Sequence, residues 1–145
     1  MHSISVRHNF ETAHRLPHLE GKCQSLHGHS WWAEVTVQCD ELAAGLVVEF
    51  GSLKRLLREW IDANLDHGAM LGPEDPLLPL LQAHGCKVFE VQEWPTVENV
   101  AILLAFHADR LLHQVVRAPG AKVVRVDVQE THVNKASWIA NADRR

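Results

Sequence analysis

The stretch K-C-Q-S-L-H-G-H-S, residues 22–30, places one thiol and two imidazoles within seven positions. His27 and His29 lie two residues apart at the entry to an alternating segment, so we expect both side chains on one side of a strand. Two imidazoles on one side suit a zinc ion but require a third ligand. His14 is the candidate, because it ends the preceding predicted strand and the intervening loop returns the chain to the same end of the sheet. Three neutral imidazoles leave the fourth tetrahedral position open, which is typical of a catalytic zinc site.

Cys23 has two alternative roles beside these histidines. As a fourth ligand, it would close a structural zinc site with one cysteine and three histidines. As a free thiol, it would take part in chemistry next to the metal. A cluster of surface histidines without any metal is a third interpretation, because short motifs of this kind also arise by chance. The pattern of residues by itself leaves these alternatives open.

The elements that must position these side chains follow from the hydrophobic pattern. Alternation of apolar and polar residues predicts β-strands at 3–14, 29–40, 122–131 and 137–139. Apolar residues three and four positions apart predict a helix at 52–65, and Thr96 is the predicted N-cap of a second helix that runs to about residue 115. This order predicts one α+β domain over residues 1–145, with a four-stranded antiparallel sheet of two hairpins and two helices on one face.

The segment between the two predicted helices, residues 68–95, is rich in loop signals. It contains four prolines, a possible helical turn at 77–84 and a possible short strand at 88–92. The open edges of a four-stranded sheet need partners, and Trp31 and Trp32 place aromatic side chains on both faces of one strand. We therefore expect copies of the chain to oligomerise.

The overall composition indicates a globular, cytoplasmic protein and argues against several other classes. A net charge of −4 and a pI near 6.2 disfavour binding to the phosphates of a nucleic acid. No stretch approaches the roughly 18 apolar residues that span a membrane, and the first residues lack the apolar core of a signal peptide. Three cysteines at scattered positions disfavour a disulfide framework. Eleven histidines against no tyrosine make metal chemistry the hypothesis to test.

Six short motifs, in order along the chain, resemble those of the 6-pyruvoyl- and 6-carboxy-tetrahydropterin synthase family. The resemblance implies the tunnelling fold, in which trimers close their sheets into a barrel and pair into hexamers. It covers nearly the whole chain, from residue 10 to residue 131. The motifs are F-E-T-A-H-R-L-P-H (10–18), C-Q-S-L-H-G-H-S (23–30), G-L-V-V-E-F (45–50), L-D-H (65–67), P-T-V-E-N (95–99) and E-T (130–131).

The resemblance also implies an activity. His14, His27 and His29 would bind zinc, and Cys23 would be a catalytic thiol instead of a ligand. The substrate would be 7,8-dihydroneopterin triphosphate, whose side-chain hydroxyls zinc can bind and acidify. Three residues between Cys23 and the H-G-H motif resemble the bacterial enzymes that make 6-carboxy-tetrahydropterin for queuosine biosynthesis, with loss of acetaldehyde and triphosphate. The alternatives are 6-pyruvoyl-tetrahydropterin synthesis or another side-chain cleavage and, more distantly, a non-catalytic zinc-binding module.

Further site residues follow from the same resemblance. Asp66 and His67 would form a pair that relays protons with the thiol. Glu130 would anchor the pterin ring by accepting two N–H bonds, and it continues the apolar face of its predicted strand, where a carboxylate needs a partner. Thr96 and Glu98 are candidates for substrate contact across a subunit boundary, although helix capping explains them equally well.

The sequence departs from the family pattern in three places. Glu49 replaces the usual aspartate, and Gly68 replaces a larger residue after the Asp-His pair. The segment 68–95 is longer than the corresponding family loop, so it could reshape the entrance for the substrate. The triphosphate requires cations, and the candidates are Lys22, Arg15 and Lys135.

Overall fold

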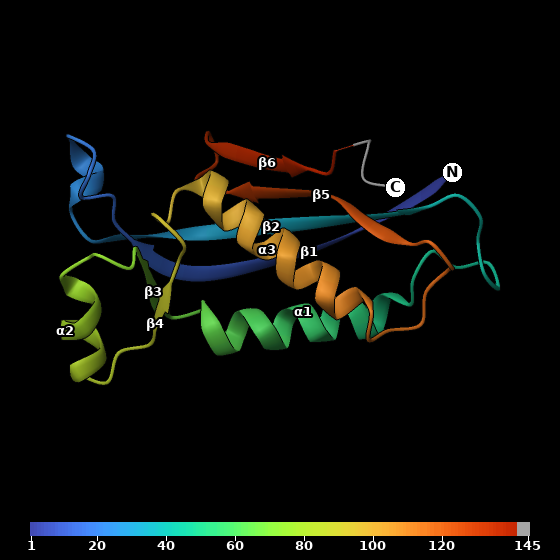
Figure 1. The fold of residues 1–145 in the computed structure, drawn as a ribbon, viewed down its shortest axis with the longest axis horizontal. Helices are drawn as coiled ribbons and strands as arrows, with labels where there is room; N and C mark the ends of the chain where they lie inside the picture. Colours follow the sequence, from blue (N-terminus) through green and yellow to red (C-terminus); the bar gives the residue numbers. More distant parts are fainter. Residues whose placement is uncertain (142–145) are drawn as a thin grey trace.

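The computed structural model describes residues 1–141, and its main feature is a six-stranded sheet (Figure 1). The strands are β1 (His2–His14), β2 (His27–Cys39), β3 (Gly68–Leu71), β4 (Val88–Glu90), β5 (Lys122–Gln129) and β6 (Lys135–Ile139). They lie side by side in the order β4-β3-β1-β2-β5-β6. The pairs β1–β2, β2–β5 and β5–β6 are antiparallel, whereas β3 is parallel to β1 and β4 is parallel to β3. The two predicted hairpins are therefore confirmed, and they are neighbours in one sheet.

Two long helices cover one face of this sheet, and a third, shorter helix lies at one end (Figure 1). These are α1 (Phe50–Asn64) and α3 (Val97–Leu112) over the face, and α2 (Leu77–Ala83) at the end. Apolar side chains of the two long helices pack against every second residue of the strands. Phe10 and Trp31 in the sheet and Leu53 in α1 are at most 1% exposed. The α+β fold class is confirmed, and the core lies between the sheet and the two long helices.

Both long helices begin at a capping side chain. The carboxylate of Glu49 accepts hydrogen bonds from the backbone N–H groups of Gly51 and Ser52, both at 2.7 Å. The hydroxyl of Thr96 accepts one from the N–H of Asn99 at 3.2 Å, as the sequence predicts. Each cap satisfies N–H groups that have no partner within the helix. Glutamate in place of the usual aspartate therefore still performs the cap of α1.

The prediction of four strands and two helices is wrong, because the segment 68–95 adds three further elements. The possible helical turn at 77–84 is the helix α2, and the possible strand at 88–92 is β4. The unpredicted strand β3 has only four residues, too few for alternation to reveal it. The backbone packs closely at both ends of β3, at Gly68 and at Gly72. A Cβ on Gly68 would lie 2.9 Å from the carbonyl oxygen of Lys87, and one on Gly72 would lie 2.5 Å from that of Glu93.

The face of the sheet opposite the helices is mainly polar. The outward residues of β1 and β2 include Ser5, Arg7 and Glu34, none of which is buried. Trp32 is the large aromatic side chain on this face, and the guanidinium of Arg7 lies 4.4 Å from its ring centroid. The expectation of apolar side chains on both faces therefore holds for Trp32 but not for its neighbours. In the part of the chain that is described, no helix is long and apolar enough to cross a membrane.

His8 is a polar side chain buried on the core face of β1. It is 6% exposed, and within residues 1–141 neither ring nitrogen makes a well-aligned hydrogen bond. Burial lowers the pKa of His8 below 6.5, and the positive charge of Arg58 lowers it further. The folded protein therefore holds this imidazole neutral, whereas the unfolded chain protonates it below pH 6.5.

We expect the His8→Leu variant to unfold with a free energy about 1 kcal/mol higher than the wild type near pH 7, because an unpaired buried polar group is removed. Wild-type stability falls as the pH drops through 6.5, since only the unfolded chain binds the proton. The advantage of the variant should therefore be larger at pH 5.5 than at pH 7.5. Urea unfolding of both proteins at the two pH values measures this, and an equal difference at both would contradict it.

Candidate metal and catalytic site

Three histidines from the first hairpin gather at one end of the sheet. The register of β1 and β2 places His14 directly opposite His27 and places His29 opposite Thr12. Because side chains alternate between the faces of a strand, all three imidazoles project on the core side of the sheet. Their candidate ligand atoms lie within 4.8 Å of one another. The predicted grouping of these side chains is therefore present in the structure.

Backbone carbonyls set the tautomers of two of these rings. Nδ1 of His14 lies 2.8 Å from the carbonyl oxygen of Pro95, and Nδ1 of His27 lies 2.6 Å from that of Ser25. A carbonyl can only accept, so each Nδ1 carries the proton and donates it. Each Nε2 is then left with a free lone pair, which is the arrangement found in histidines that bind metals.

The buried nitrogens of the cluster lack hydrogen-bond partners. Nε2 of His14 and Nε2 of His29 are both inaccessible and unpartnered within residues 1–141. Burial lowers the pKa of each of these two histidines, which favours neutral rings. Oε1 of Glu130 lies 3.0 Å and 3.5 Å from the two nitrogens, but the alignment is too poor for a hydrogen bond. A cation between these nitrogens and the carboxylate would partner both, so the three imidazoles could hold a metal ion.

Trp31 forms the base of the cluster. Its ring is fully buried and stands edge-on to His14, with ring centroids 4.9 Å apart. Its indole Nε1 donates a hydrogen bond to the carbonyl oxygen of Thr12 at 3.1 Å. The ring therefore has a fixed orientation, and it excludes water from the inner side of the three histidines.

Cys23 lies in the loop between β1 and β2, in the short 3₁₀ turn Lys22–Gln24, and it is exposed. Its carbonyl oxygen accepts a hydrogen bond from the N–H of Leu16 at 2.7 Å, which closes the base of the loop. The cysteine is not among the side chains whose candidate ligand atoms gather within 4.8 Å. The loop thus carries a free, exposed thiol that is not part of the histidine cluster.

Asp66 and His67 follow the end of α1 and lie at the outer edge of β1. Oδ2 of Asp66 is 2.6 Å from Nδ1 of His67, and Oδ1 accepts from the N–H of Glu11 at 2.8 Å. Partial burial raises the pKa of Asp66, but these hydrogen bonds outweigh it and hold the pKa below its usual value. The carboxylate is therefore ionised and orients an exposed imidazole. Within residues 1–141, no hydrogen bond joins this pair to Cys23.

The other candidate residues are distributed unevenly around the cluster. Glu130 directly follows β5 and faces His14 and His29, as described above. Thr96 performs the cap of α3, and Glu98 is exposed in the first turn of that helix. Neither makes a hydrogen bond to the three histidines in the described chain.

The three candidate cations for a triphosphate also differ. Lys22 is exposed near Cys23, and Lys135 lies 3.4 Å from the carboxylate of Asp127. Arg15 donates from Nε to the carboxylate of Asp75 at 2.7 Å. Because Asp75 is 1% exposed, this ion pair ties the segment 68–95 to the strand end that carries His14.

Two contacts of the site were not predicted. The carbonyl of Pro95 orients His14, and the ring of Trp94 stacks on His18 with centroids 4.6 Å apart. Both residues precede the N-cap of α3, so a segment distant in sequence supports the loop of Cys23. The P-T-V-E-N motif was the only available signal for this position, and it does not reveal a backbone acceptor.

The family model described as 6-pyruvoyl tetrahydropterin synthase matches residues 3–140. The chain belongs to this family. A 6-carboxy-5,6,7,8-tetrahydropterin synthase of Rickettsia typhi is 37% identical over 101 residues, which cover 68% of this chain and 73% of that protein. The protein of the same name from Aquifex aeolicus is 33% identical over 123 residues, which cover 81% of this chain and 75% of the relative.

Solved structures with low sequence identity share the fold of this chain. A 6-pyruvoyl tetrahydropterin synthase of Caenorhabditis elegans aligns with a TM-score of 0.64 at 24% identity, over 96% of this chain and 95% of that one. An uncharacterized protein of Wolinella succinogenes aligns with a TM-score of 0.81 at 23% identity, over 97% and 98%. Family membership supports an enzyme with lyase-type activity.

Proposed function

We propose that this protein is a zinc-dependent lyase that converts 7,8-dihydroneopterin triphosphate and water to 6-carboxy-5,6,7,8-tetrahydropterin, acetaldehyde and triphosphate. The observation that carries the proposal is the cluster of three histidines, in which Nε2 of His14 and Nε2 of His29 are buried and unpartnered in the described chain. The relatives named as 6-carboxy-tetrahydropterin synthases and the short spacing between Cys23 and the H-G-H motif support this product. The pathway would be queuosine biosynthesis, in the cytoplasm.

The residues of the chain divide the work of this reaction. A zinc ion held by the three histidines would act as a Lewis acid that binds and acidifies the side-chain hydroxyls of the substrate. Glu130 would accept N–H bonds from the pterin ring, which requires an ionised carboxylate beside the cluster. Cys23, as a thiolate, would remove a proton from the substrate side chain, and Asp66 would orient His67 for transfer of that proton. Thr96 and Glu98 remain candidates for substrate contact.

The assembly we propose is a homohexamer of two trimeric barrels. β1 pairs with β3 only from Thr12 to His14, so the edge from His2 to Phe10 has no partner strand in the described chain. β6 is the other end of the sheet. Two unpaired edges favour closure between copies, because an exposed edge invites another strand. Since the Asp66–His67 pair lies on the outer edge of β1, a neighbouring copy is a candidate source of the pair for each Cys23.

The product decides between this proposal and its alternatives. Purified protein is incubated with zinc and 7,8-dihydroneopterin triphosphate, and the products are identified by mass spectrometry. We expect 6-carboxy-tetrahydropterin together with acetaldehyde. A 6-pyruvoyl-tetrahydropterin product would overturn the proposed reaction while retaining the pterin substrate. A metal-loaded protein that leaves the substrate intact would favour a non-catalytic zinc-binding module.

A further inference from the structure

Lys87 brackets the turn that carries His67. Its ammonium Nζ donates to the carbonyl oxygens of Asp62 and Asp66, both at 2.7 Å. Its own carbonyl oxygen accepts from the N–H of Ala69 at 3.0 Å. One side chain and one peptide group of Lys87 therefore hold both sides of the turn from residue 66 to residue 69.

The turn needs such support because His67 has a left-handed backbone. Its φ is +56°, a region that glycine adopts readily but that costs other residues about 1–2 kcal/mol. The N–H of His67 donates to the carbonyl oxygen of Glu11 at 2.6 Å, which holds one side of the turn against β1. Lys87 holds the residues on both sides of His67, through the carbonyl of Asp66 and the N–H of Ala69. A strained residue persists where its surroundings fix it, and such residues cluster at functional sites.

Gly68 explains how Lys87 comes so close. A Cβ at this position would lie 2.9 Å from the carbonyl oxygen of Lys87 and 3.1 Å from its Cγ. Contacts below 3.0 Å are not tolerated, so a larger residue would push Lys87 away from the turn. The glycine after the Asp-His pair and the long segment 68–95 are thus two parts of one arrangement.

The charge of Lys87 suits its position. The carboxyl end of α1 carries a partial negative charge from its free carbonyl groups, and a cation there is stabilising. Burial raises the pKa of Asp66, and the positive charge of Lys87 adds to the larger effects of the N–H of Glu11 and of His67 that hold this pKa below its usual value. An ionised Asp66 is what the N–H groups of Glu11 and His67 require as an acceptor.

We propose that Lys87 is a positioning residue for the Asp66–His67 pair, and that the segment 68–95 delivers it. This inference rests on the proposed function, because the pair is assigned there to proton transfer. Lys87 itself does not touch the substrate. It acts by fixing the backbone on both sides of His67, and therefore the direction of the imidazole.

Three variants test this role. Lys87→Met retains the alkyl chain and removes the ammonium, Lys87→Arg retains a cation with several donors, and Lys122→Met removes an exposed lysine at the start of β5 as the matched control. The turnover of each variant with 7,8-dihydroneopterin triphosphate is measured across the pH range. Hydrogen–deuterium exchange is measured for each variant on the peptide that covers residues 66–69.

We expect Lys87→Met to lower kcat by about tenfold or more with little change in KM, because misplacement of a catalytic group affects the chemical step. The acid limb of its kcat profile should move toward higher pH, because the carboxylate of Asp66 loses a nearby cation. Exchange of the amides of residues 67–69 should become faster. Lys87→Arg should recover most of kcat, and Lys122→Met should match the wild type.

If Lys87→Met keeps the kcat and the exchange rate of the wild type, the proposed role of Lys87 is wrong. The role is also wrong if kcat and exchange change to the same extent in Lys87→Met and Lys122→Met. A failure of the proposed function is distinguishable, because it removes turnover from the wild type itself and leaves the exchange measurement intact. Faster exchange in Lys87→Met alone would then still support the contact between Lys87 and the turn.

Discussion

In the Cys23→Ala variant, we expect kcat to fall by about 10²–10⁴-fold while the zinc content stays at the wild-type level. The size of the loss is that of a missing proton-transfer group. The metal should remain, because three histidines gather without the cysteine and their ring nitrogens are oriented by the carbonyls of Pro95 and Ser25. Cys23 is exposed, so its removal leaves no cavity in the core. Steady-state kinetics and metal analysis by mass spectrometry measure the two effects.

The matched control is Cys86→Ala, which removes the other exposed cysteine. Cys86 lies between α2 and β4, and we expect its variant to keep both wild-type turnover and wild-type zinc content. If Cys23→Ala loses zinc together with its fold, the cysteine is a structural ligand and the catalytic assignment is wrong. If Cys23→Ala retains full turnover, the proton-transfer role is wrong and the metal site is unaffected.

In the His27→Ala variant, we expect zinc affinity to fall at least 100-fold and turnover to be lost. Loss of an outer partner of a metal ligand already costs 10–100-fold, and loss of the ligand itself costs more. His27 is chosen because it is partly exposed, whereas His14 is fully buried and its replacement would also disturb the packing around Trp31. Dialysis against a graded zinc chelator, followed by metal analysis, measures the affinity.

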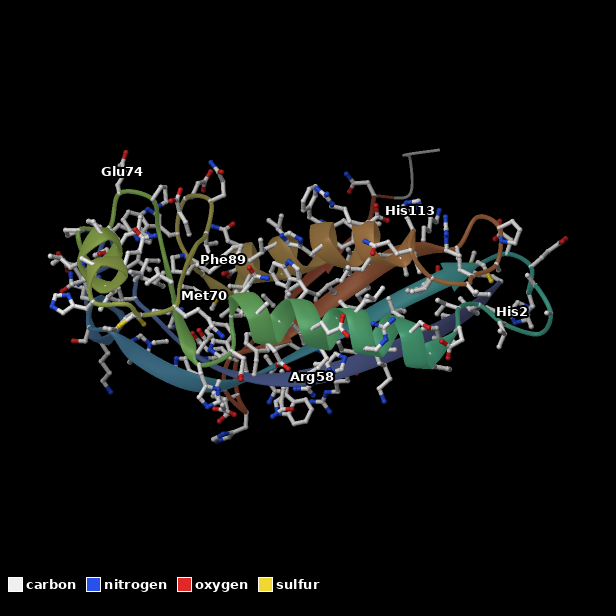
Figure 2. All side chains as sticks on the ribbon, turned by 90° about the horizontal axis from the view of Figure 1, so that it is seen from below. His2, Arg58, Met70, Glu74, Phe89 and His113 are labelled. Carbon is white, nitrogen blue, oxygen red and sulfur yellow. The ribbon has the colours of Figure 1, made fainter. Side chains whose placement is uncertain are left out.

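The control for this variant is His2→Ala. His2 is an exposed histidine at the start of β1, and Figure 2 places it at the opposite end of the molecule from the segment that contains Met70, Glu74 and Phe89. It should bind zinc as the wild type does. Retention of wild-type zinc affinity by His27→Ala would contradict the three-histidine site. Loss of zinc in both variants would show that removal of any histidine destabilises the protein.

The sequence by itself predicted the grouping of the three histidines. The reason is geometric: side chains two residues apart on a strand share a side, and the ends of a hairpin meet at one end of a sheet. His27 and His29 satisfy the first rule, and His14 satisfies the second. The caps of the long helices are similarly local, since Glu49 and Thr96 bond to groups within three residues of themselves.

The tertiary structure alone decided what the segment 68–95 does. Its strand β3 pairs in parallel with β1, more than fifty residues away, and β4 pairs in parallel with β3; no local periodicity encodes such partners. The carbonyl of Pro95 meets His14, Asp75 meets Arg15, and Lys87 meets the end of α1, each across a long span of chain. The residue types in these contacts form no recognisable sequence motif, so the contacts could not be predicted.

The division between the two follows from the range of the forces. Alternation, helical spacing and capping act within a few residues, so they predicted the two hairpins and the two long helices, while the short motifs carried the likeness to the pterin synthase family. The acceptor that fixes the tautomer of His14 and the contacts of Lys87 around His67 are set by long-range contacts that form only when distant segments pack, whereas the acceptor for His27 lies two residues away. The sequence predicted that His14, His27 and His29 gather, and the packing of residues 68–95 decided how His14 and His67 are held.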